Sequence, residues 1–175
     1  MEQLYFAQSS IYLKKKKFKN AKLSLIKGLE IKPKKVSAIF QLGNIFLMEK
    51  NYKDALKQFD KAININKEFW QAMNNKGLIY FETNNRSLAI VSFKKAIQIE
   101  ENSEPMLALA VTLQDSQPKE SILLAKKALQ TNPNYVSAQY RKEQLWGSKI
   151  QKATEKLFKL EELKKDIKKA KLNKN

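Results

Sequence analysis

A 34-residue periodicity constrains the fold of this chain more than any other feature of its sequence. When residues 36–69 are aligned with residues 70–103, small, aliphatic and aromatic residues fall at equivalent positions. The matched pairs are Gly43 and Gly77, Phe46 and Tyr80, Ala55 and Ala89, Phe59 and Phe93, Ala62 and Ala96, and Ile65 and Ile99. Repetition at this period is typical of proteins in which each repeat is one supersecondary unit packed against its neighbours.

The same pattern extends to both sides of these two blocks. Towards the N-terminus it predicts a repeat over residues 2–35, in which Ser9 replaces the expected glycine and Pro33 ends the second helix. Beyond residue 103 the pattern weakens, and it predicts a fourth repeat over residues 104–135 that closes at Pro133. This repeat is two residues shorter than the others, and we expect the loss in the turn around residues 114–118. A fifth helix is expected over residues 135–147.

Each repeat is expected to be a hairpin of two helices. The chain contains only 4 Gly and 4 Pro in 175 residues, which favours helix over irregular structure. Within residues 36–69, apolar residues recur every three or four positions in two runs separated by Glu49, Lys50 and Asn51. Asparagine tolerates the left-handed conformation that ends a helix, so the turns at residues 49–51 and 83–85 are explained by their Asn residues.

The small and aromatic positions together resemble one known family. Residues 39–46 read Ile39-x2-Leu42-Gly43-x2-Phe46, and residues 55–62 read Ala55-x3-Phe59-x2-Ala62. This arrangement resembles the tetratricopeptide repeat family. The resemblance implies an all-α, right-handed α-solenoid of stacked helix-turn-helix hairpins over residues 1–147, followed by a C-terminal capping helix.

Residues 148–175 are expected to form this basic amphipathic helix, with one continuous helix over residues 149–172. Its apolar residues recur every three or four positions, and they are Ile150, Ala153, Leu157, Leu160, Leu163, Ile167 and Ala170. A helix that covers the open end of a repeat array explains this pattern. A helix that pairs with a partner, with a second copy of the chain or with a membrane surface is the alternative.

The net charge of +17 is concentrated at the two ends of the chain. Residues 1–35 carry +8 and residues 136–175 carry +7, whereas the centre carries only +2. Four consecutive lysines, Lys14, Lys15, Lys16 and Lys17, are expected at the turn of the first hairpin. We interpret them as solvated side chains, with an electrostatic site for nucleic acid or an anionic membrane as the alternative. No aromatic residues alternate with them as in many RNA-binding segments.

The composition excludes several kinds of chemistry. The chain has no Cys and no His, so it offers no thiolate or imidazole ligand for a metal and no Ser-His-Asp or Cys-His nucleophile. It also lacks phosphate-binding glycine loops and an Asp-rich calcium loop. We therefore expect no cofactor and no enzymatic activity. Without a basic signal segment or an apolar run of ~20 residues, the chain is expected to be a soluble cytoplasmic protein.

Recognition of another protein is the remaining function, and the resemblance places it on the concave face lined by the first helix of each hairpin. The residues expected there are Phe40, Gln41, Asn44, Gln71, Asn74, Asn75, Phe81, Tyr140 and Arg141. Amide side chains at these positions donate and accept hydrogen bonds at once, which suits a peptide backbone. Asn44 and Asn75 match the backbone-gripping Asn of peptide-binding members of the family.

One specific binding mode of the family is not expected here. Chaperone-tail adaptors grip an acidic carboxyl terminus with two Asn, two Lys and one Arg. When Asn44 and Asn75 are matched to the two Asn, the three basic positions hold Phe40, Pro105 and Leu109. These residues cannot replace cationic donors. We therefore expect an adaptor, scaffold or assembly factor with an unidentified partner protein or peptide. Electrostatic binding of nucleic acid or membrane through the ends, and self-association, are the alternatives.

Overall fold

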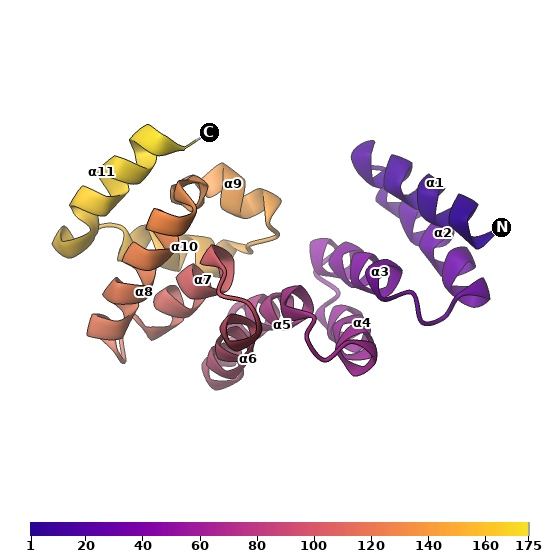
Figure 1. The fold of residues 1–175 in the computed structure, drawn as a ribbon, viewed down its shortest axis with the longest axis horizontal. Coiled ribbons are helices and arrows are strands. Elements are labelled where there is room, and N and C mark those ends of the chain that lie inside the picture. Colours follow the sequence, from indigo (N-terminus) through magenta and orange to yellow (C-terminus); the bar gives the residue numbers. More distant parts are fainter. Residues whose placement is uncertain (175) are drawn as a thin grey trace. The chain divides into compact units, whose positions relative to one another are not determined.

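The computed structural model describes residues 1–174, and these form helices joined by short turns with no strand among them (Figure 1). The helices are α1 (Glu2–Lys14), α2 (Phe18–Ile31), α3 (Val36–Met48), α4 (Tyr52–Ile65), α5 (Trp70–Glu82), α6 (Arg86–Ile99), α7 (Ser103–Leu113), α8 (Pro118–Thr131), η1 (Pro133–Val136), α9 (Ala138–Glu143), α10 (Ser148–Leu157), η2 (Glu161–Leu163) and α11 (Lys164–Asn173). The predicted all-α fold built from paired helices is confirmed.

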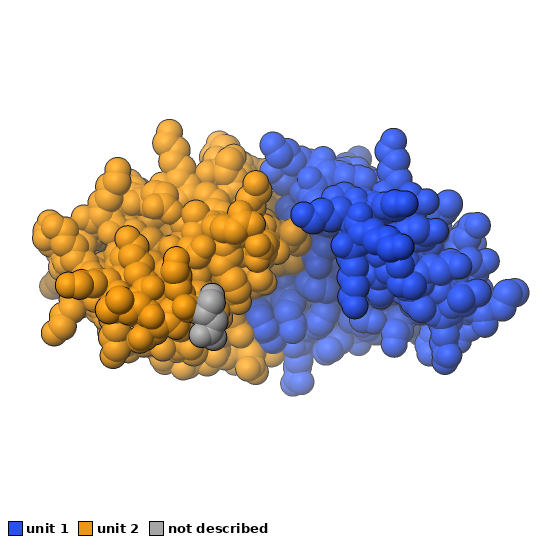
Figure 2. All heavy atoms as spheres, turned by 90° about the horizontal axis from the view of Figure 1, so that it is seen from above, with its two compact units in different colours: residues 1–72 blue, residues 73–175 orange. Residues whose placement is uncertain are grey.

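The chain divides into two compact units (Figure 2). Unit 1 consists of residues 1–72 and unit 2 begins at residue 73, so the boundary lies within α5. Each unit has its own buried core, and the two are described separately below.

Unit 1 contains two hairpins, α1–α2 and α3–α4, and α2 also packs against α3. The interface between the hairpins buries Ala21 and Leu25 of α2 together with Leu42 and Ile45 of α3. At its edge Lys22 donates to both carboxylate oxygens of Glu49 at 2.8 Å. The repeat positions chosen from the 34-residue pattern are therefore the ones that hold neighbouring helices together.

A glycine allows the two helices of the second hairpin to approach closely. A Cβ atom added at Gly43 would lie 2.6 Å from Cε1 of Phe59, which is far inside van der Waals contact. In the first hairpin the glycine and the aromatic ring are on the opposite helices. There Gly28 of the second helix, α2, faces the ring of Phe6 on the first helix, α1. Ser9, at the position equivalent to Gly43, is buried and donates to the backbone oxygen of Phe6 at 2.7 Å.

Replacement of Gly43 by leucine is expected to destabilise the chain by about 1–3 kcal/mol, because the new side chain overpacks the crossing with Phe59. Urea unfolding followed by circular dichroism measures this loss. The first hairpin suggests the control, since it combines Ser9 with Leu25 at the two equivalent positions. The double variant Gly43→Ser, Phe59→Leu should therefore unfold closer to wild type than Gly43→Ser alone. A Gly43→Leu variant as stable as wild type would contradict the close approach.

The turns within the first three hairpins share one backbone conformation. A non-glycine residue with positive φ stands at the same position in each turn: Lys16 (56°), Lys50 (58°) and Asn84 (64°). The expectation that asparagine accounts for the turns at residues 49–51 and 83–85 agrees with Asn84 but is wrong for residues 49–51, where Lys50 holds this conformation. Asn51 instead caps the following helix, where its side chain accepts a hydrogen bond from the backbone of Asp54 at 3.3 Å.

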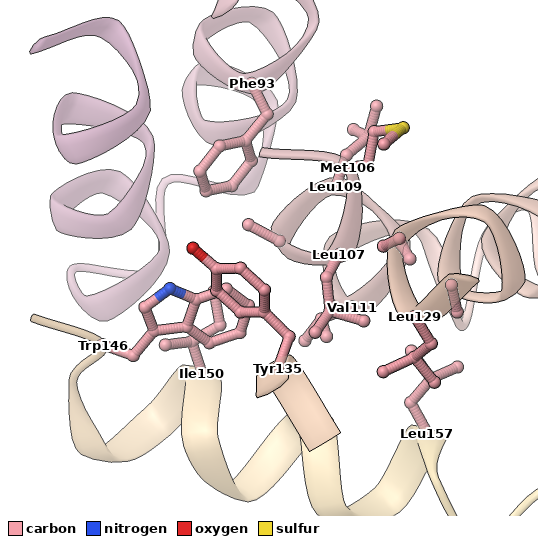
Figure 3. Close-up of a cluster of buried hydrophobic side chains, with 14 of the residues drawn as sticks. Phe93, Met106, Leu107, Leu109, Val111, Leu129, Tyr135, Trp146, Ile150 and Leu157 are labelled. Atoms are coloured by element: carbon pink, nitrogen blue, oxygen red, sulfur yellow. The ribbon is translucent and has the colours of Figure 1, made fainter. Parts of the chain in front are cut away.

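Unit 2 is organised around α7, all of whose 11 residues are buried. Helices α6 and α8 pack against it, and so does α10 from the C-terminal segment. Figure 3 shows Tyr135, Trp146 and Ile150 directed into the same apolar cluster as Leu107 and Phe93. Helices α7 and α8 form a hairpin where the fourth repeat is expected. Helix α7 is two residues shorter than the 13-residue α5, whereas the turn at residues 114–117, where the loss was expected, is not shorter than the turn at residues 83–85.

The single helix expected over residues 135–147 is replaced by η1 and the six-residue α9. The carbonyl oxygens of Tyr135 and Val136 accept hydrogen bonds from the side chain of Arg141, at 2.7 and 3.1 Å. Ser137 then caps α9 by accepting from the backbone of Tyr140. A side chain has taken the place of the backbone donors that would have continued the helix.

The continuous helix expected over residues 149–172 is also wrong, because α10 ends at Leu157 and α11 begins at Lys164. Leu160 is in an extended conformation at the break and is 36% exposed. The break lets the segment turn, so that α10 packs on α7 while α11 packs on α8 and η1 (Figure 1). Ile167 and Ala170 of α11 are buried as a result, so the segment caps unit 2 up to its last turn.

Candidate functional site

The residues predicted to line a binding face are distributed over both units. Those of unit 1 are Phe40, Gln41, Asn44 and Gln71, and those of unit 2 are Asn74, Asn75, Phe81, Tyr140 and Arg141. The two groups differ in accessibility. All four residues of the first group are half-buried, whereas four of the five in the second group are buried.

In unit 1 the predicted residues lie on one side of α3 and at the start of α5. Phe40 packs at a tilt against Phe59 and edge-on against Phe69, with ring centroids 5.7 and 4.9 Å apart. These contacts fix the ring and leave part of it accessible. Gln41 and Asn44 are three residues apart on α3 and therefore share a face. This side of α3 combines an anchored aromatic ring with two amide side chains.

In unit 2 the equivalent side of α5 is covered by the chain itself. Asn74, Asn75 and Phe81 are at most 6% exposed. Asn74 donates to Glu104 of α7 at 2.9 Å and to Asn75 at 3.3 Å. In this arrangement these side chains stabilise unit 2. Their role in partner binding stays a prediction, and it requires these side chains to become accessible.

Glu104 is the centre of a buried polar network that the sequence did not reveal. Its Oε1 accepts from Asn74 and from the indole nitrogen of Trp146, at 2.9 and 3.2 Å, and Tyr135 also donates to it. Burial raises the pKa of Glu104 to about 7, although these three hydrogen bonds act in the opposite direction. Burial and the neighbouring Glu104 in turn raise the pKa of Tyr135. Figure 3 shows the Tyr135 hydroxyl and the Trp146 indole nitrogen on the same side of the cluster.

Arg141 is fully buried and joins α9, η1 and α10. Besides its two bonds to η1, it donates to Gln151 at 2.9 Å and forms an ion pair with Glu155. Its guanidinium lies 5.2 Å from the ring centroid of Phe158. Burial lowers the pKa of Arg141, and Glu155 opposes this shift. Tyr140 beside it is half-buried and packs edge-on against Tyr135, with centroids 5.0 Å apart.

A second acidic residue, Glu82 at the end of α5, fixes the start of α10. Its carboxylate accepts from the backbone of Lys149 at 3.3 Å and of Ile150 at 2.9 Å. These are first-turn donors that a helix leaves unsatisfied, and a carboxylate also complements the positive end of the helix. The segment over residues 135–157 is therefore held on α5 by Glu82 and on α7 by Glu104, while Arg141 joins η1, α9 and α10 within the segment.

The lysine run of the first hairpin is where the sequence placed it. Lys14 is the last residue of α1, and Lys15, Lys16 and Lys17 form the turn to α2. All four side chains are exposed. Over the part of the chain that the structure describes, no group of acidic residues is arranged to hold a metal ion. Within the same residues, no helix is both long and apolar enough to cross a membrane.

Comparison with known families agrees with the repeat assignment. Models of the tetratricopeptide repeat match residues 2–35, 36–69 and 71–103, which is more than half of the chain. The chain belongs to the tetratricopeptide repeat family. No relative with a curated description matches its sequence.

Solved structures with similar folds include several forms of one protein. The crystal structure of MamA protein matches with a TM-score of 0.70 and 20% identity, over 99% of this chain and 96% of that one. Residues 41 to the end of MamA from Desulfovibrio magneticus RS-1 match with a TM-score of 0.70 and 18% identity, over 98% and 89%. The first repeat domain of Spaghetti (RPAP3), bound to the HSP90 peptide SRMEEVD, matches with a TM-score of 0.62 and 17% identity, over 65% and 91%. At these identities the likeness concerns the fold.

Proposed function

We propose that this chain is a protein-binding module without catalytic activity, which holds a segment of a partner protein on the half-exposed side of α3. Tetratricopeptide repeats generally mediate protein–protein interactions, and the RPAP3 domain named above carries a bound peptide. The observation that carries the proposal is the combination of Phe40, Gln41 and Asn44 on one side of α3. The amides suit a peptide backbone, and the anchored ring offers apolar surface at little cost in side-chain entropy.

The double variant Gln41→Ala, Asn44→Ala is expected to keep its helicity and melting temperature but to lose about tenfold or more in partner capture. Both side chains are half-buried on a helix surface, so their truncation leaves the core intact. Capture from native lysate with nuclease added, quantified by mass spectrometry at low and moderate salt, measures the loss.

The matched control for this experiment removes two amides from α4 of the same unit. The variant Gln58→Ala, Asn64→Ala changes the same chemistry on a different helix and should capture the partner as wild type does. Equal capture by the α3 variant and wild type would show that the partner binds elsewhere.

A second function, electrostatic binding through the basic ends, is favoured by the exposure of Lys14, Lys15, Lys16 and Lys17. Phosphate contacts release counterions, so this mode weakens steeply as salt rises, whereas peptide binding on α3 does not. Material captured only without nuclease and only at low salt would identify nucleic acid as the ligand. In that case the binding surface would be the lysine run.

A further inference from the structure

Unit 2 contains a basic pocket of about 630 Å³ between the α5–α6 turn and α10. This volume lies within the range of pockets that hold small ligands or short peptide segments. Its cationic lining residues come from two distant parts of the sequence, and they are Arg86, Lys149, Lys152, Lys156 and Lys159. The pocket exists only because the C-terminal segment packs onto the repeats.

The four lysines are directed to one side by their spacing. They follow one another at intervals of three, four and three residues, which places Lys149, Lys152 and Lys156 on one face of α10 and Lys159 just beyond its end. Glu155 is the acidic residue of the lining, and it is engaged in the ion pair with Arg141. The pocket therefore has an excess of positive charge that its own acid does not neutralise.

Hydrogen bonds hold several of these cations in position. Asp115 forms ion pairs with both Arg86 and Lys156, at 3.3 and 2.9 Å, so one carboxylate orients two cations. Lys149 donates to the side chain of Asn84 at 3.1 Å. Lys152 lines the pocket, is exposed, and makes no ion pair within residues 1–174. The site presents both oriented and available positive groups.

The pocket also has an apolar part. Phe81, which is 6% exposed, and the half-buried Ala153 contribute to its lining, and the Arg86 guanidinium lies 6.0 Å from the centroid of the Phe81 ring. A ligand that matches the whole surface needs negative groups around a small apolar group.

We propose that this pocket binds a short acidic peptide segment with one apolar side chain, which lies on Phe81 and Ala153 while its carboxylates pair with Arg86 and the lysines of α10. Nucleic acid fits less well, because Phe81 exposes too little of its ring to stack a base. A membrane surface fits less well, because the apolar part lies inside a recess. The site is separate from the α3 surface proposed above. It also uses none of the positions at which chaperone-tail adaptors of this family carry their two Asn, two Lys and one Arg.

Fluorescence anisotropy with defined probes tests the proposal on the full chain. The first probe is a labelled peptide of four glutamates around a central leucine, the second has serine in place of the leucine, and the third is a thymidine oligonucleotide of equal charge. We expect the leucine peptide to bind most tightly. The variant Lys152→Glu, Lys159→Glu should weaken its binding roughly tenfold or more, since two attractive charges become repulsive.

The control variant Lys94→Glu, Lys95→Glu carries the same change in net charge on exposed residues of α6 in the same unit. It should alter binding of the leucine peptide by less than about threefold, because only long-range attraction changes. Circular dichroism and melting should be the same for both variants. Equal weakening by the two variants, or no weakening by either, would overturn the proposal.

The remaining outcomes are equally decisive. Tighter binding of the oligonucleotide than of the leucine peptide would identify the pocket as a nucleic-acid site. Equal binding of the two peptides would show that the ligand's apolar side chain does not contact Phe81 and Ala153. The Gln41→Ala, Asn44→Ala variant should bind the leucine peptide as wild type does. Weaker binding of the leucine peptide by that variant would show that the peptide binds on α3 and not in the pocket. The experiment therefore distinguishes failure of the pocket proposal from failure of the function proposed for unit 1.

Discussion

Replacing Arg141 by alanine is expected to lower the free energy of unfolding by about 3–5 kcal/mol. The side chain is fully buried, so truncation leaves a cavity between α9, η1 and α10. It also leaves the carbonyl oxygens of Tyr135 and Val136 without the donor that satisfies them. The lost ion pair adds little, because Glu155 is 57% exposed and is solvated once its partner is gone.

Two further variants separate the causes of this loss. Arg141→Met fills most of the space without donating hydrogen bonds, so its stability should lie between those of wild type and Arg141→Ala. Glu155→Gln removes only the exposed partner and should cost less than about 1 kcal/mol. Urea unfolding monitored by circular dichroism gives all three values. A loss of less than about 1 kcal/mol in Arg141→Ala would mean that α9 and η1 do not depend on these hydrogen bonds.

The parts of the fold that the sequence predicted are those built from contacts that recur from one repeat to the next. Gly43 and Phe59 are 16 positions apart, and Gly77 and Phe93 repeat the same contact 34 residues later. A contact that recurs at a fixed period leaves a periodic trace in the sequence. The hairpins α1–α2 to α7–α8 were therefore accessible from the pattern alone.

The contacts of the C-terminal segment occur once and leave no such trace. Glu82 binds the backbone at Ile150, and Glu104 binds Trp146, across 68 and 42 positions. Nothing in the spacing of apolar residues marks these acids as buried. An acidic residue within an otherwise apolar helix, as Glu104 is in α7, is the only local signal, and it indicates burial without naming the partner.

The break between α10 and α11 was missed for a related reason. Leu157, Leu160 and Leu163 keep a helical spacing through the break, so the periodicity predicts one continuous helix. The helix breaks because the apolar side chains of α11 are buried against α8 and η1. Ile167 and Ala170 reach that surface only after the chain has turned towards α8. The predicted face differs for a separate reason, because Asn74 is buried where it donates to Glu104 of α7.

The buried Glu104 also makes stability depend on pH. Its pKa is about 7 in the folded chain and near 4.5 when unfolded, so the folded state holds the proton more tightly. Stability from this group is fully present below about pH 4.5, falls as pH rises and is lost above about pH 7. Between pH 5 and pH 8 the expected loss is about 2.5 kcal/mol.

The variant Glu104→Gln isolates this contribution from all other titrating groups. The new amide keeps an oxygen for Asn74 and Trp146, and Oδ1 of Asn74, which has no donor within residues 1–174, is an acceptor on the same neighbouring side chain. The variant should therefore fold, and it should be more stable than wild type at pH 8 by more than it is at pH 5. The contribution of Glu104 is the difference between the free energies of unfolding of the two proteins at each pH, because all other titrating groups are the same in both.

Trp146 reports on the same site, because its indole nitrogen donates to Glu104. Introducing Trp70→Phe into both proteins leaves Trp146 as the only indole. Urea unfolding followed by its fluorescence at intervals from pH 5 to pH 8 gives the stability of the C-terminal segment, and circular dichroism gives that of the whole chain. Parallel pH curves for Glu104 and Glu104→Gln proteins would show that Glu104 remains ionised when folded. Curves that separate as pH rises from 5 to about 7, and run parallel above that, establish that its burial favours the protonated form, and that deprotonation weakens the hold of α7 on the segment over residues 135–157.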